Sequence, residues 1–160
     1  MEDLSALYTT FMSSGMDFIS AKNIVMDNSS DKVWLISGSV YRNIAHILYG
    51  ADKPEVDFDF IIERPKENII LPNGWKLGQN RYGNPKFLGS KFSIDFVPLH
   101  NIRSILRRKL APSIENYLTG TPFNVQSIAY DVMKGRLAGN IGLKAIAEKI
   151  IRINNKEKFE

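Results

Sequence analysis

The stretch Val56-Asp57-Phe58-Asp59-Phe60-Ile61-Ile62 alternates carboxylates with large apolar side chains. Side chains two apart on a β-strand point to the same face, so the pattern predicts that Asp57 and Asp59 share one face while Phe58 and Phe60 occupy the other. Two adjacent ionised carboxylates are costly to bury unless cations accompany them. Because oxygen ligands favour Mg²⁺, the pair is a candidate metal site.

A second apolar run, Phe92-Ser93-Ile94-Asp95-Phe96-Val97, contributes a third alternating carboxylate. Three carboxylates on two neighbouring strands can hold two cations about 4 Å apart, the arrangement used for phosphoryl and nucleotidyl transfer. Asp57, Asp59 and Asp95 are therefore the predicted catalytic and metal-binding residues, with Mg²⁺ or Mn²⁺ as the cofactor. A lone Asp-X-Asp pair is also typical of a solvated strand face, so the prediction depends on the surrounding sequence.

The dipeptide Gly38-Ser39 follows the apolar run Val33–Ile36 and precedes a helix-like segment that ends at Tyr49. A turn between a strand and a helix exposes backbone N–H groups at the helix N-terminus, which suits phosphate oxygens. Ser39 is equally typical of a helix N-cap, and Arg42, one turn further on, is equally typical of a surface salt bridge. Gly38, Ser39 and Arg42 are the predicted nucleotide-binding residues.

Together, these residues resemble the signature of the DNA polymerase β-type nucleotidyltransferase superfamily. The likeness is greatest to the head domain of bacterial poly(A) polymerases and CCA-adding tRNA nucleotidyltransferases. Their opening motif, Gly-Gly-x-x-Arg-Asp, is similar to Gly38-Ser39-Val40-Tyr41-Arg42-Asn43, and the run Phe123–Asp131 partly matches a later motif. The resemblance extends from about Val33 to Ile151 and implies a nucleotidyltransferase fold. The order of helical and strand-like runs itself predicts an α/β (α+β) fold with a mixed, bent sheet of about five strands flanked by helices.

The resemblance implies metal-dependent transfer of a nucleoside monophosphate from an NTP, such as ATP, to a hydroxyl group, with release of pyrophosphate. The acceptor stays open among an RNA or tRNA 3′ end, a protein side chain and a small molecule. The family's Arg-Arg-Asp is replaced by Gly120-Thr121-Pro122, and a family Asn by Gln126. Because the basic pair is missing, a non-catalytic nucleotide-binding or interaction module is the alternative function.

Length and composition restrict the other possibilities. The 160 residues, 44% of them hydrophobic, predict one domain (1–160) that includes an N-terminal helical segment (1–30). The absence of cysteine excludes disulfides and thiol nucleophiles. No run is typical of a signal peptide or a membrane span, so a cytoplasmic location is expected. The net charge of +4 permits nucleic-acid contact, and the basic cluster Arg103, Arg107, Arg108 and Lys109 is as consistent with a solvated face as with a phosphate contact.

Overall fold

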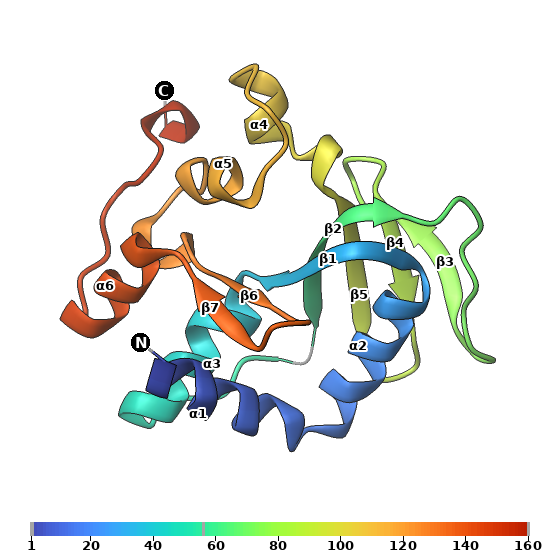
Figure 1. Cartoon of the computed structure of the whole chain (residues 1–160), viewed down its shortest axis with the longest axis horizontal. Helices are drawn as coiled ribbons and strands as arrows, with labels where there is room; N and C mark the ends of the chain where they lie inside the picture. The colour runs from blue at the N-terminus through green and yellow to red at the C-terminus, as the bar shows by residue number, and fades with distance from the viewer. Residues whose placement is uncertain (1, 56, 160) are drawn as a thin grey trace.

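A curved sheet of seven strands, in the order β3-β4-β5-β2-β1-β6-β7, organises the computed structural model, which describes residues 2–55 and 57–159 (Figure 1). The strands are β1 (Ser29–Ile36), β2 (Phe58–Pro65), β3 (Lys76–Gln79), β4 (Pro85–Leu88), β5 (Ser93–Pro98), β6 (Ala129–Asp131) and β7 (Arg136–Ala138). Strands β2 and β5 pair in parallel, whereas the other neighbours pair antiparallel. The predicted mixed α+β fold is confirmed, with two strands more than the five expected.

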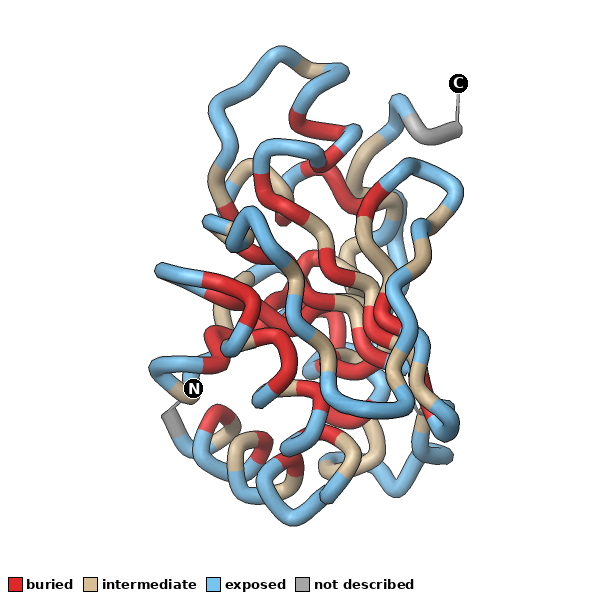
Figure 2. Tube along the Cα trace, turned by 90° about the vertical axis from the view of Figure 1, so that its right-hand side faces the viewer, coloured by how far each residue is buried: buried red, intermediate tan, exposed pale blue. Residues whose placement is uncertain are grey.

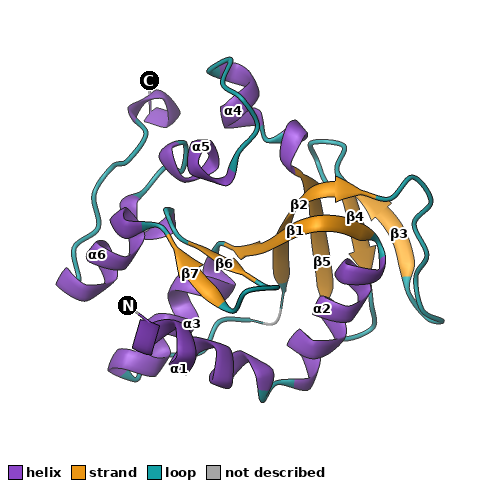
Figure 3. Ribbon diagram, viewed as in Figure 1, coloured by secondary structure: helices purple, strands orange, loops and turns teal. Residues whose placement is uncertain are grey.

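Helices cover both faces of the sheet (Figure 3). They are α1 (Glu2–Ser13), α2 (Met16–Asp27), α3 (Gly38–Tyr49), α4 (Arg103–Arg107), α5 (Ile114–Thr119) and α6 (Asn140–Glu148), with 3-10 turns η1 (Leu99–Asn101), η2 (Asn124–Gln126) and η3 (Lys156–Phe159). The larger apolar cluster packs α1, α2, α3 and α6 against one face. The smaller cluster packs η1, α4 and α5 against the other. No helix in the described part of the chain is long and apolar enough to cross a membrane.

The side chains of β2 point alternately into the two clusters, as the alternating sequence predicts. Phe58, Phe60 and Ile62 belong to the larger cluster, whereas Ile61 belongs to the smaller one. Asp59 therefore lies on the face that carries α4 and α5. The central strands form the most continuous buried part of the trace, with exposed loops around them (Figure 2).

Several element boundaries differ from those predicted. Strand β2 begins at Phe58, so Asp57 stands just before the strand, and Val56 lies outside the described residues. Strand β1 begins at Ser29, inside the segment 1–30 that was expected to be helical. Helix α3 ends at Tyr49 as expected, because Gly50, which follows it, adopts the left-handed conformation (φ 69°) that closes helices. The two extra strands, β6 and β7, have three residues each, too few for an alternation pattern to be recognised.

Tyr8 on α1 tests how strongly the N-terminal helices stabilise the site region. Its hydroxyl donates to the carbonyl oxygen of Ser39 at 2.9 Å, and the residue is 0% exposed. Tyr8→Phe should lower the free energy of unfolding by about 1 kcal/mol in urea titrations, because a buried hydrogen bond is lost. The matched control is Tyr49→Phe, whose hydroxyl donates to Ile146 near the surface, where water can replace it. An equal decrease in the free energy of unfolding in both variants would contradict a stabilising role of the Tyr8 hydrogen bond.

Candidate functional site

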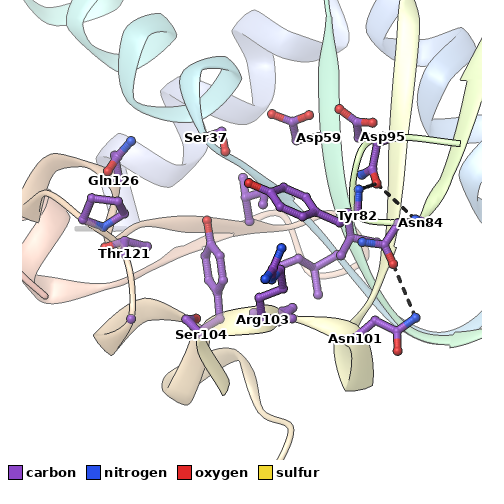
Figure 4. Close-up of a pocket in the computed structure, with 18 of the residues that line it drawn as sticks. Ser37, Asp59, Tyr82, Asn84, Asp95, Asn101, Arg103, Ser104, Thr121 and Gln126 are labelled. Carbon is purple, nitrogen blue, oxygen red and sulfur yellow. Dashed lines mark hydrogen bonds between the residues drawn. The ribbon is translucent and has the colours of Figure 1, made fainter. Parts of the chain in front are cut away.

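Two carboxylates meet on the α4–α5 face of the sheet. Asp59 and Asp95 are direct partners in the parallel pairing of β2 with β5, and Figure 4 shows their side chains next to each other. Burial, together with the hydrogen bond and negative charge of Asp95, raises the pKa of Asp59 to about 7. A favourable contact with the Ser37 hydroxyl opposes this rise. Without a cation, the pair therefore holds a proton up to about neutral pH.

One oxygen of this pair is left without a partner. Asp95 Oδ1 is buried and accepts no hydrogen bond, the one such atom among the side chains of residues 3–55 and 57–157. An unpaired buried carboxylate oxygen is costly, and a divalent cation is a partner that suits it. The donor set of Asp59 and Asp95 thus fits a hard cation with oxygen ligands.

Asp57 lies nearby but is oriented differently. It is exposed, and its Oδ1 accepts hydrogen bonds from the backbone N–H and the hydroxyl of Ser93, at 3.0 and 3.1 Å. Its charge still contributes to the raised pKa of Asp59. No group of three or more His, Cys, Asp or Glu side chains is arranged to hold a metal within the described residues. The structure therefore brings Asp59 and Asp95 together and leaves Asp57 bonded to Ser93 at the entrance to β2.

The turn before α3 positions Ser37, rather than Ser39, beside the carboxylates. Ser37 lines the cavity described below, with φ 66° and ψ −148°, a backbone conformation that favours glycine. Ser39 is buried, and its hydroxyl donates to the Asp57 carbonyl at 2.9 Å. Arg42 is exposed and folds back over Gly38, where an added Cβ would lie 3.5 Å from Arg42 Cδ. Neither Ser39 nor Arg42 lines the cavity.

A cavity of about 470 Å³ opens in front of the acidic pair. Its far wall comes from α4, α5 and the loop between β3 and β4 (Figure 4). The polar and aromatic residues that line it include Ser37, Tyr82, Asn84, Arg103, Arg107 and Tyr117. This volume is in the range of small-molecule sites in proteins.

Tyr117 connects the far wall to the acidic pair. Burial raises the pKa of its phenol, which also has a favourable contact with Ser37. The phenol therefore stays protonated at any physiological pH and can donate a hydrogen bond. Tyr117 and Tyr82 were not identified from the sequence, because aromatic residues in a short helix and a loop carry no pattern that separates them from packing residues. Gln126 also lines the cavity.

The solved structures that this fold resembles include a tRNA nucleotidyltransferase, a tRNA-processing enzyme and a CCA-adding enzyme. No protein-family model and no curated protein matches the sequence. A tRNA-processing enzyme with CTP is 20% identical, with a TM-score of 0.55, over 80% of this chain and 34% of that one. A tRNA nucleotidyltransferase complexed with a primer tRNA and an incoming ATP analog is 19% identical, with a TM-score of 0.55, over 80% of this chain and 37% of that one.

A CCA-adding enzyme of Thermotoga maritima complexed with tRNA is 15% identical, with a TM-score of 0.53, over 87% of this chain and 37% of that one. At such identities the likeness shows the fold, so the expected nucleotidyltransferase fold is confirmed. The chain spans between 34% and 37% of the length of these three enzymes.

The shared proton of the acidic pair predicts how metal-free stability depends on pH. The pKa of Asp59 rises from 3.8 to about 7 on folding, so the folded state binds more protons between these values. The free energy of unfolding should therefore fall as the pH rises from about 4 through about 7, by at most about 1.4 kcal/mol per pH unit. Urea titrations in EDTA across this range measure the slope.

Asp59→Asn should flatten this slope, because the titrating carboxyl is removed. The control is Asp31→Asn, at an exposed residue paired with Arg64, which should retain the wild-type slope. A wild-type stability that rises over the same pH interval would show that Asp59 and Asp95 do not share a proton.

Proposed function

We propose that the protein is a metal-dependent nucleotidyltransferase that moves a nucleoside monophosphate from an NTP to a hydroxyl acceptor. The observation that supports this most directly is the half-buried pair Asp59 and Asp95, with its buried, unpartnered oxygen, at the head of a nucleotide-sized cavity. In the reaction, the acceptor oxygen forms a bond to the α-phosphorus while the bond to pyrophosphate breaks. The acceptor proton is released, and pyrophosphate departs.

The acidic residues are assigned the metal-binding role. Asp59 and Asp95 would hold Mg²⁺ or Mn²⁺, and Asp57 would join them through the oxygen that does not bond Ser93. The cation supplies charge neutralisation and lowers the pKa of the acceptor hydroxyl. Asp95 would also take the acceptor proton. At the N-terminus of α3, the backbone N–H groups of Gly38 and Ser39, with the nearby Arg42, are proposed to contact phosphate oxygens.

The proposed acceptor is an RNA 3′ end, such as that of tRNA, acted on in the cytoplasm. The likeness to enzymes described in complex with tRNA supports this choice over a protein side chain or a small molecule. Incubation with each labelled NTP, Mg²⁺ and either total RNA or a cell lysate separates the three. Label in RNA supports the proposal. Label on protein or on a small metabolite would support the same reaction with that molecule, rather than RNA, as the acceptor.

A non-catalytic nucleotide-binding module is the second candidate. It is favoured by the position of Asp57, whose carboxylate is bonded to Ser93, and by Gly120-Thr121-Pro122 in place of a basic pair. Titration with NTP and Mg²⁺ distinguishes the two functions. Tight binding with no release of pyrophosphate, across RNA, protein and small-molecule acceptors, would favour the module.

Replacing either paired carboxylate should remove activity without unfolding the protein. Asp59→Asn and Asp95→Asn are each expected to lower the rate of NMP transfer at least about a hundredfold, because a ligand of the cation is lost. Transfer is measured as label incorporated and pyrophosphate released, with circular dichroism to confirm folding. Asp52→Asn, at an exposed residue outside the cavity, is the control and should keep full activity. A fully active Asp59→Asn variant would rule out the mechanism.

Binding of metal and nucleotide should stabilise the folded state at about pH 7.5. At one hundred times the dissociation constant, a ligand that binds only the folded protein contributes about 2.7 kcal/mol. Mg²⁺ with an NTP is therefore expected to raise the melting temperature of the wild type, and to raise it much less in Asp59→Asn and Asp95→Asn. Equal shifts in all three proteins would mean that the carboxylates do not form a common metal site.

A further inference from the structure

The two walls of the cavity carry opposite charges. Asp59 and Asp95 lie on the sheet side, and Arg103 and Arg107 of α4 line the other side, with Arg103 labelled in Figure 4. Both arginines are exposed, and neither forms an ion pair with an acidic side chain of the described residues. A ligand that is anionic and also binds a cation can contact both walls at once.

Arg108, which follows Arg107, has a structural role that Arg103 and Arg107 do not share. Its Nε donates to the Ser104 carbonyl at 2.9 Å, one terminal nitrogen donates to the Thr119 hydroxyl at 2.9 Å, and the other to the Asn116 carbonyl at 2.6 Å. Arg108 therefore ties α4 to α5 and has few donors left for a ligand. Arg103 and Arg107, four residues apart on α4, share one helix face and both line the cavity.

Arg103 is also held in place from the hairpin loop. Its guanidinium lies 4.9 Å from the centre of the Tyr82 ring, and that of Arg81 lies 4.7 Å from the same ring. The loop is further joined to η1 by a hydrogen bond of 3.3 Å from Asn101 Nδ2 to Asn84 Oδ1 (Figure 4). A guanidinium stacked on an aromatic face keeps its N–H donors free at its edge, the geometry that suits bidentate contact with a phosphate group.

We propose that Arg103 and Arg107 bind the polyphosphate of the nucleotide across the cavity from the acidic pair, and that Tyr82 is the positioning residue for Arg103. The proposal rests on the proposed function for the identity of the ligand. The cavity, about 470 Å³ in volume, has room for one nucleotide, whereas the charge of an RNA backbone would extend well beyond it. Arg103 and Arg107 thus supply positive charge that Gly120-Thr121-Pro122 does not.

Inorganic tripolyphosphate tests this proposal without any assumption about the base. Isothermal titration calorimetry in Mg²⁺ should show that Arg103→Ala and Arg107→Ala each weaken tripolyphosphate binding about tenfold, and the double variant about a hundredfold. The affinities of the same variants for ATP and CTP should decrease in parallel. The matched control is the double variant Lys76→Ala/Arg152→Ala, which removes the same charge at exposed residues outside the cavity and should bind within about twofold of the wild type.

The positioning role of Tyr82 is tested by two variants, one that retains the aromatic ring and one that removes it. Tyr82→Phe retains the ring and should bind tripolyphosphate as the wild type does, whereas Tyr82→Leu should bind about as weakly as Arg103→Ala. A merely structural role of the loop would show as a lower melting temperature with unchanged affinity. That result would overturn the positioning role.

Three outcomes would overturn the arginine assignment. They are a wild type that binds neither tripolyphosphate nor NTP, arginine variants that bind both as the wild type does, and variants that lose only affinity for an RNA 3′-end oligonucleotide. Failure of the proposed function is a separate result. If polyphosphate binding depends on the two arginines but no acceptor is ever labelled, the anion site stands and the transferase activity does not.

Discussion

The candidate site depends on the parallel pairing of β2 with β5, which sets Asp59 directly beside Asp95. Neighbouring strands lie about 4.8 Å apart, so register rather than loop conformation determines how close the two carboxylates are. Burial, together with this proximity, raises the pKa of Asp59 to about 7 and destabilises the charged pair. The other face of the same strands compensates, because Phe58, Phe60 and Phe96 pack there in the larger apolar cluster.

The same pairing explains why the cavity walls gather at one end of the sheet. Parallel neighbours need a connection that returns to the starting end, and here it includes the β3–β4 hairpin. Since β4 runs antiparallel to β5, with Lys86 opposite Asp95, the hairpin loop lies near the end of β5 where the chain enters η1 and α4. Tyr82 from the loop and Arg103 from α4 therefore meet beside the carboxylates.

The sequence predicted those features that rest on regular periodicity. Alternation in the aspartate strand correctly separated Asp59 from Phe58 and Phe60, and the helix after β1 ends at Tyr49 as predicted. Features that depend on a single backbone conformation or on long-range packing could not be predicted from the sequence. In the run Ser37-Gly38-Ser39, only the backbone dihedral angles reveal that the first serine faces the cavity. Likewise, the cluster from Arg103 to Lys109 divides into cavity and structural residues only once α5 has packed against α4.

Ser37 shows how backbone strain and site electrostatics are coupled. Its conformation, with φ 66° and ψ −148°, costs a residue with a side chain about 1–3 kcal/mol, a cost that glycine would avoid. Glycine, however, would remove the hydroxyl that contacts Asp59 and Tyr117. That hydroxyl favours the ionised form of Asp59, the same form that a bound cation favours. The strained serine and a cation therefore act in one direction, each offsetting part of the repulsion that the parallel strands impose on the acidic pair.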